Sequence, residues 1–105
     1  MDSVVELEYL DGGIVLVTLT NGKVNALSGA VVARIGEIAA ELTAAPPKVV
    51  VVTGGPKIFA AGADISEFGG PDEAAGITER IHVALYALAA IPRFVIAEVS
   101  GYALG

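Results

Sequence analysis

A run of small residues offers the clearest opportunity for chemistry in this chain. Residues 57–65 (KIFAAGADI) follow a β-branched run, Val49–Thr53, and a pair of glycines. Because alanine and glycine side chains do not intervene, backbone N–H groups in such a loop can approach a ligand, and N–H groups aimed at a carbonyl oxygen form an oxyanion hole. The same residues also suit a tight connection that uses Ala and Gly for packing, and composition alone favours that simpler interpretation.

A second segment ends in a glycine-containing turn. Residues 94–99 form an apolar run that enters Ser100-Gly101, and a following helix would present free N–H groups and a positive dipole end. On its own, this pattern is more often a plain turn. Two nucleotide sites are disfavoured: Gly54-Gly55 lacks the Gly-Lys-Ser/Thr continuation of a phosphate loop, and Gly101 with Gly105 lacks the third glycine of a dinucleotide-binding turn.

Composition and charge exclude several classes of protein. The 105 residues carry 6 Lys and Arg against 12 Asp and Glu, a formal net charge of −6, and no basic patch suited to nucleic acid. The chain has no cysteine for disulfides or thiolate chemistry. His82 is the only histidine, so we predict no metal site and interpret His82 as a structural residue.

No membrane partner is expected. The apolar stretch at residues 83–99 is interrupted by Pro92-Arg93 and is too short to span a bilayer. The first residues lack the basic start and apolar core of a signal peptide. We therefore expect a cytoplasmic protein.

The elements that would position these loops begin with two strands. Residues 5–9 alternate between apolar residues and glutamate, a period of two that predicts a strand with one face in water. Residues 11–13 (DGG) are a turn signal. The apolar run Ile14–Leu19 then predicts the second strand of a β-hairpin, covered on both faces.

Helical spacing occurs twice. Ser28 can cap a helix over residues 28–45, which Pro46-Pro47 would end. Its apolar face comprises Val31, Ile35, Ile38, Ala39 and Leu42. A second helix is predicted from residue 72 or 73 to residue 90. Its inner face would comprise Ile77, Ile81, Leu85 and Leu88.

Strands and helices therefore alternate along the chain. Val49–Thr53 and residues 94–99 are predicted as buried parallel strands, residues 58–64 as a loop, and residues 65–70 as a turn or short helix. The order β-β-α-β-α-β indicates an α/β fold with an initial β-hairpin and a mostly parallel sheet. Nothing in the sequence marks an internal domain boundary.

Three segments together resemble a known family. Residues 59–65 (FAAGADI) resemble the first signature of the crotonase, or enoyl-CoA hydratase/isomerase, superfamily, and residues 101–105 (GYALG) resemble the start of its second. Residues 24–27 (VNAL) resemble the Asn-Ala-Leu element after the family's first hairpin. The resemblance covers essentially the whole chain. It implies a ββα superhelix, of which residues 1–105 would be the N-terminal part of the core domain, apparently truncated.

The resemblance also implies a site. The N–H of Ala63 would be the first oxyanion-hole donor to the thioester carbonyl of an acyl-CoA substrate, with no cofactor and no metal. The implied substrate-binding residues are Val24, Ala26, Ala61, Ala63, Asp64, Ile65, Tyr102 and Gly105. In the family the second donor would follow Gly105 and the catalytic glutamates lie further on. We therefore expect a polypeptide of these 105 residues to be inactive alone.

The resemblance implies hydration of a 2-enoyl-CoA, as in fatty-acid β-oxidation, because the Ala-Gly-Ala-Asp-Ile loop is similar to that of hydratases. Isomerase, hydrolase, dehalogenase and decarboxylase relatives share the loop chemistry. A non-catalytic acyl-CoA-binding or assembly module is the alternative from a different class. The full-length protein is expected to form a homotrimer or a dimer of trimers.

Acidic residues near these motifs remain open to two interpretations. Glu98 stands where a small apolar residue is usual in the family, and Ser100 where Asn is usual. Glu98 is either a catalytic carboxylate or, the favoured interpretation, a residue that pairs with a polar group or lies at an exposed strand edge. Asp64 and Glu67 look like paired carboxylates, but we expect Asp64 to hold the loop backbone.

Overall fold

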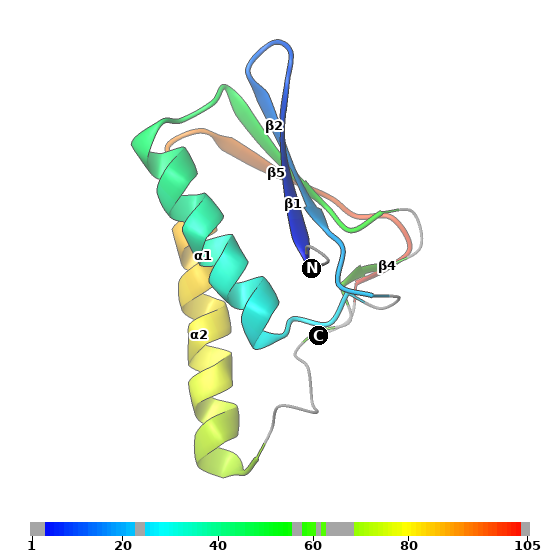
Figure 1. Cartoon of the computed structure of the whole chain (residues 1–105), viewed down its shortest axis with the longest axis vertical. Coiled ribbons are helices and arrows are strands. Elements are labelled where there is room, and N and C mark those ends of the chain that lie inside the picture. The colour runs from blue at the N-terminus through cyan, green and yellow to red at the C-terminus, as the bar shows by residue number, and fades with distance from the viewer. Residues whose placement is uncertain (1–3, 23–24, 56–57, 61, 63–68, 104–105) are drawn as a thin grey trace.

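The structure of the chain is a computed structural model that describes residues 4–22, 25–55, 58–60, 62 and 69–103. Two helices, α1 (Gly29–Ala44) and α2 (Pro71–Ala89), run side by side on one side of a sheet, as Figure 1 shows. The other side of that sheet carries no helix within the described ranges. The molecule is thus a layer of helices against a layer of strands.

The main sheet has four strands in the order β1 (Val5–Leu10), β2 (Ile14–Leu19), β3 (Val49–Thr53) and β5 (Phe94–Glu98). The first two pair antiparallel, with Val5 opposite Leu19. The pairs β2–β3 and β3–β5 are parallel. This confirms the predicted α/β class with an initial hairpin followed by parallel strands.

A second, smaller sheet joins two segments that are far apart in sequence. The strand β4 (Ile58–Ala60) pairs in parallel with β6 (Tyr102–Ala103). The prediction that residues 58–64 form only a loop is therefore wrong at its start. The pairing with β6 satisfies backbone groups that a free loop would have to present to water.

The helix α1 forms where local signals agree. The Ser28 side chain accepts a hydrogen bond from the N–H of Val31 at 3.3 Å, which caps the first turn. The helix ends just before Pro46-Pro47, which cannot continue it. Its buried residues are those predicted, namely Val31, Ile35, Ile38, Ala39 and Leu42. They pack against Val15, Val17 and Val50 in one apolar core.

The helix α2 begins one residue earlier than predicted, at Pro71, a position where the missing N–H costs nothing. The prediction for its inner face is partly wrong. Ile77 and Leu88 are buried, but Ile81 is half-buried and Leu85 is 44% exposed, whereas Ala84 is buried. The small Ala84 side chain lies in the contact with α1. The buried face of α2 is therefore rotated from the predicted face, toward Ala84 and away from Leu85.

The outer face of the sheet is open to solvent, which corrects the prediction of a buried strand at residues 94–99. The strand ends at Glu98, and Phe94 and Ile96 are 78% and 51% exposed. The strand β2 was expected to be covered on both faces, yet Ile14 is 36% exposed and only alternate residues are buried. Both errors have one cause: the helices cover a single face. None of the helices in the described part is both long and apolar enough to cross a bilayer.

Candidate functional site

The turn after β2 meets the ends of β3 and β4, and one side chain joins them. Asn25 is 4% exposed and has φ 51°, a left-handed conformation that asparagine tolerates better than most residues. Its side-chain Nδ2 donates hydrogen bonds to the backbone oxygens of Gly54 at 2.9 Å and Phe59 at 3.3 Å. Its Oδ1 accepts from the N–H of Asn21 at 2.8 Å. A single buried amide therefore ties three backbone segments together.

Gly54 allows the backbones of β3 and β4 to come close. A Cβ built on Gly54 would overlap the backbone oxygen of Phe59 and lie 2.6 Å from its Cα. Glycine is the residue that permits such an approach between two main chains. The position just after β3 therefore cannot accept a side chain without moving β4.

A backbone hydrogen bond then reaches the small-residue segment itself. The N–H of Leu27 donates to the oxygen of Gly62 at 2.7 Å. Gly62 is buried and has φ 90°. On the other side of the turn, Asn21 Nδ2 donates to the oxygen of Ala26 at 2.7 Å. The turn at residues 21–28 is thus bonded both internally and to Gly62.

The structure describes two of the residues that the sequence predicted for substrate binding. Ala26 is half-buried in this turn. Tyr102 lies in β6, where it is the register partner of Ile58. The pairing of β4 with β6 therefore brings the segments of the two family signatures side by side. Outside the described residues lie Val24, Ala61, Ala63, Asp64, Ile65 and Gly105, with Glu67 among the acidic candidates.

The remaining candidates lie on the surface. Glu98 is exposed at the end of β5, opposite Thr53 in register, which agrees with the interpretation as an exposed strand position. His82 is exposed on α2, and its ring centroid is 6.2 Å from that of Tyr86.

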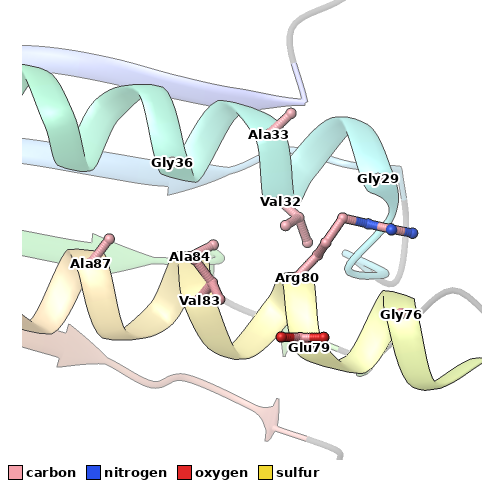
Figure 2. A pocket seen from close by; sticks show the side chains of 10 residues that line it. All are labelled: Gly29, Val32, Ala33, Gly36, Gly76, Glu79, Arg80, Val83, Ala84 and Ala87. Atoms are coloured by element: carbon pink, nitrogen blue, oxygen red, sulfur yellow. The ribbon is translucent and has the colours of Figure 1, made fainter.

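A groove of 590 Å³ lies between α1 and α2, and Figure 2 shows it. Its walls are mainly small and apolar, including Gly36 on α1 and Ala84 on α2. The side chain of Arg80 extends toward the start of α1 near Gly29 (Figure 2). Ala26, a predicted substrate-binding residue that the structure describes, does not line this groove.

Replacing Gly54 by alanine should destabilise the chain, because the new methyl group overlaps the β4 backbone. We expect Gly54→Ala to lower the free energy of unfolding by about 1–3 kcal/mol, the usual cost of overpacking. Gly36→Ala is the matched control, since a Cβ there meets nothing within 4 Å and the residue lies inside α1. That variant should gain about 0.5–1 kcal/mol. Urea unfolding of both variants checks the difference in sign, and equal shifts would contradict it.

The strands and helices follow a ββα-type order, and the pairing of β4 with β6 brings the two signature segments together. These two features define the class of protein. Residues 10–105 match the family described as enoyl-CoA hydratase/isomerase. The chain therefore belongs to the enoyl-CoA hydratase/isomerase family, which confirms the crotonase resemblance.

Individual relatives agree with this assignment. The chain is 38% identical over 82 residues to 2,3-dehydroadipyl-CoA hydratase of Escherichia coli K12, an alignment that covers 77% of the chain and 32% of that protein. The structure of Pseudomonas aeruginosa DspI matches with a TM-score of 0.88 at 27% identity, over 97% of the chain and 43% of DspI. An enoyl-CoA hydratase/carnitine racemase from Magnetospirillum magneticum matches with a TM-score of 0.84 at 33% identity, over 96% and 40%. The chain thus spans about a third to two fifths of the length of these relatives.

Proposed function

We propose that this chain contributes to an enzyme that acts on acyl-CoA thioesters and hydrates the double bond of a 2-enoyl-CoA. Family membership supports the substrate class. The similarity to a protein named as a dehydroadipyl-CoA hydratase supports hydration over the other reactions of the family.

The proposed chemistry is stabilisation of negative charge on the thioester oxygen. When water adds to the conjugated double bond, charge develops on that oxygen as in an enolate. The N–H of Ala63 would donate to it, and such a donor acts most strongly when it is held in place before the reaction. The substrate path would be lined by Val24, Ala26, Ala61, Asp64, Ile65, Tyr102 and Gly105. The second donor and the acid and base carboxylates of the family belong to positions after Gly105.

One observation carries the proposal: the N–H of Leu27 donates to the oxygen of Gly62, the residue that precedes Ala63. Gly62 is also buried. An oxyanion donor needs a rigid backbone, because a mobile N–H would have to be ordered during the reaction. The bond also satisfies a buried backbone oxygen, as a tight connecting loop would require, so the kinetic tests on residue 63 have to separate the two roles.

The test uses a polypeptide that continues this segment over the full length of its relatives, incubated with crotonyl-CoA. We expect 3-hydroxybutyryl-CoA as the product, identified by mass spectrometry, because water adds without loss of the thioester. A displaced double bond would indicate an isomerase, and release of free CoA would indicate a hydrolase. Binding of crotonyl-CoA with no conversion would indicate a non-catalytic module. Each of the last three results would contradict hydration.

We further propose that the full-length protein is cytoplasmic and assembles as a homotrimer or a dimer of trimers. Exposed apolar side chains such as Phe94 and Tyr86, 78% and 73% exposed, are of the kind that assembly or further chain would cover. Light scattering of the full-length protein tests the assembly: a mass of three or six subunits is expected, and a monomer, dimer or tetramer would contradict it.

A further inference from the structure

Asn25 combines three features that rarely coincide in a plain turn. It is polar yet 4% exposed, its backbone is left-handed at φ 51°, and its amide bonds to backbone groups far away in the sequence. Its acceptors, Gly54 and Phe59, are 29 and 34 residues further along the chain. A buried polar group that contacts two main-chain carbonyls fixes the distance between them.

The positions of the two acceptors show which segment these hydrogen bonds hold. Gly54 directly follows β3, and Phe59 lies within β4. Asn25 is therefore bonded to the segment that precedes Gly62 in the chain. Two residues after Asn25, the N–H of Leu27 holds Gly62 itself at 2.7 Å. One short turn therefore contacts the chain on both sides of residue 61.

The planar peptide bond links the hydrogen bond at the Gly62 oxygen to the N–H of the next residue. The oxygen of Gly62 and the N–H of Ala63 belong to the same peptide unit, which is planar, and in its trans form they point in opposite directions. A hydrogen bond that restrains the oxygen of such a unit therefore also restrains its N–H. Bonds in a chain also polarise one another, so the bonded peptide becomes a stronger N–H donor.

We propose that Asn25 is a positioning residue for the peptide unit that joins Gly62 to Ala63, an inference that rests on the proposed oxyanion role of the Ala63 N–H. The described contacts of Asn25 are with backbone groups of the chain. It anchors the turn to β3 and β4, so that Leu27 meets the Gly62 oxygen in a fixed direction.

Asn25→Asp tests this in the 105-residue chain without reference to any reaction. Aspartate keeps the size of asparagine, tolerates the left-handed backbone and can still accept from Asn21, but its carboxylate cannot donate to Gly54 or Phe59. Hydrogen exchange should show about a tenfold loss of protection at the Leu27 N–H near neutral pH, as expected when a local hydrogen-bonded unit opens. Protection of the Ile38 N–H in α1 should change by less than about twofold, because that core lies outside the opened unit.

The pH dependence separates positioning from a general loss of packing. A buried carboxyl facing two carbonyl oxygens has its pKa raised, because burial penalises the charged form. Below that pKa the protonated group can donate one hydrogen bond. Protection at Leu27 in Asn25→Asp should therefore recover in part as the pH falls. Asn25→Gly, which keeps the backbone conformation but has no side chain, should lose protection and show no recovery.

In the full-length enzyme, Asn25→Asp should lower kcat for crotonyl-CoA hydration about tenfold with a smaller loss of product affinity, because the oriented N–H acts mainly on the developing charge, whereas the same turn also holds Ala26 of the proposed substrate path. Unchanged Leu27 protection in Asn25→Asp and Asn25→Gly would overturn the proposal, as would an equal loss at Leu27 and Ile38. If the wild-type enzyme hydrates no enoyl-CoA, the proposed function fails separately. The exchange at Leu27 still decides whether Asn25 positions Gly62.

Discussion

A polypeptide limited to these 105 residues is expected to hydrate crotonyl-CoA far more slowly than one that continues over the full length of its relatives. The shorter polypeptide lacks the position after Gly105 that would provide the second oxyanion donor, and loss of one such donor costs about 10²–10³ in rate. It would also lack the acid and base carboxylates that the family resemblance implies further on, and such groups contribute about 10²–10⁴ more. The two losses together predict no measurable turnover above background.

The control for this prediction is proof that the shorter polypeptide is folded. Its circular dichroism spectrum should show the mixed helix and strand content of the structure, and hydrogen exchange should show protection in α1. Hydration at a rate near that of ordinary enzymes by this folded polypeptide would contradict the prediction. The carboxylates of Glu98 and Glu67 would then become the candidates for proton transfer.

The elements with strong local signals could be predicted from sequence alone. The helix α1 has a capping serine, five apolar residues at helical spacing and a pair of prolines after its end, and all three signals act within one segment. The hairpin of β1 and β2 likewise depends on a turn and on residues that are close in sequence. These signals can be recognised without knowing which distant residues the segment contacts.

Burial could not be predicted where it depends on what covers a face. An apolar run such as Phe94–Glu98 is typical of a buried parallel strand, but Phe94 and Ile96 are exposed here because the helices lie on the other face, whereas Val95 packs against the core. Leu85 fits the helical spacing of a buried residue, yet the packing of α2 on α1 is set by small residues such as Ala84. Both outcomes depend on three-dimensional packing rather than on local pattern.

The candidate site also has a part that the sequence predicted and a part that it did not. The small-residue loop drew attention by its composition, and the role of Ala63 in it came from the family resemblance and stays a prediction. The sequence marked Asn25 as part of the Asn-Ala-Leu resemblance and Gly54 as part of a glycine pair, but it did not predict their contacts, because the partners lie far away along the chain. A lone asparagine followed by Ala-Leu, or a glycine after a strand, has many ordinary explanations until the contacts with Phe59 are seen.

Replacing Ala63 by proline in the full-length enzyme is expected to lower kcat by about 10²–10³, equivalent to about 3–4 kcal/mol of transition-state stabilisation. Proline has no backbone N–H, so the substitution deletes the proposed donor. Ala63→Ser is the matched variant that keeps the N–H and adds only a small side chain. It should retain near-normal kcat, because the proposed role belongs to the backbone.

Distortion of the loop is the alternative cause of any loss in Ala63→Pro. Proline restricts the conformation of the residue before it, and here that residue is Gly62, whose oxygen accepts from Leu27. A distorted loop would weaken the binding of substrate and product as much as it slowed the reaction. A deleted oxyanion donor would act mainly on the reaction, since its interaction strengthens as negative charge develops.

The most direct measurement therefore compares, in Ala63→Pro and in the wild-type enzyme, kcat for crotonyl-CoA hydration with the dissociation constant of 3-hydroxybutyryl-CoA. The predicted result is a loss of kcat of about 10²–10³ with a change in product affinity of less than about threefold. A folded Ala63→Pro enzyme with near-normal kcat would contradict the oxyanion role of residue 63. Residues 57–65 would then be a tight connection whose small side chains serve packing alone.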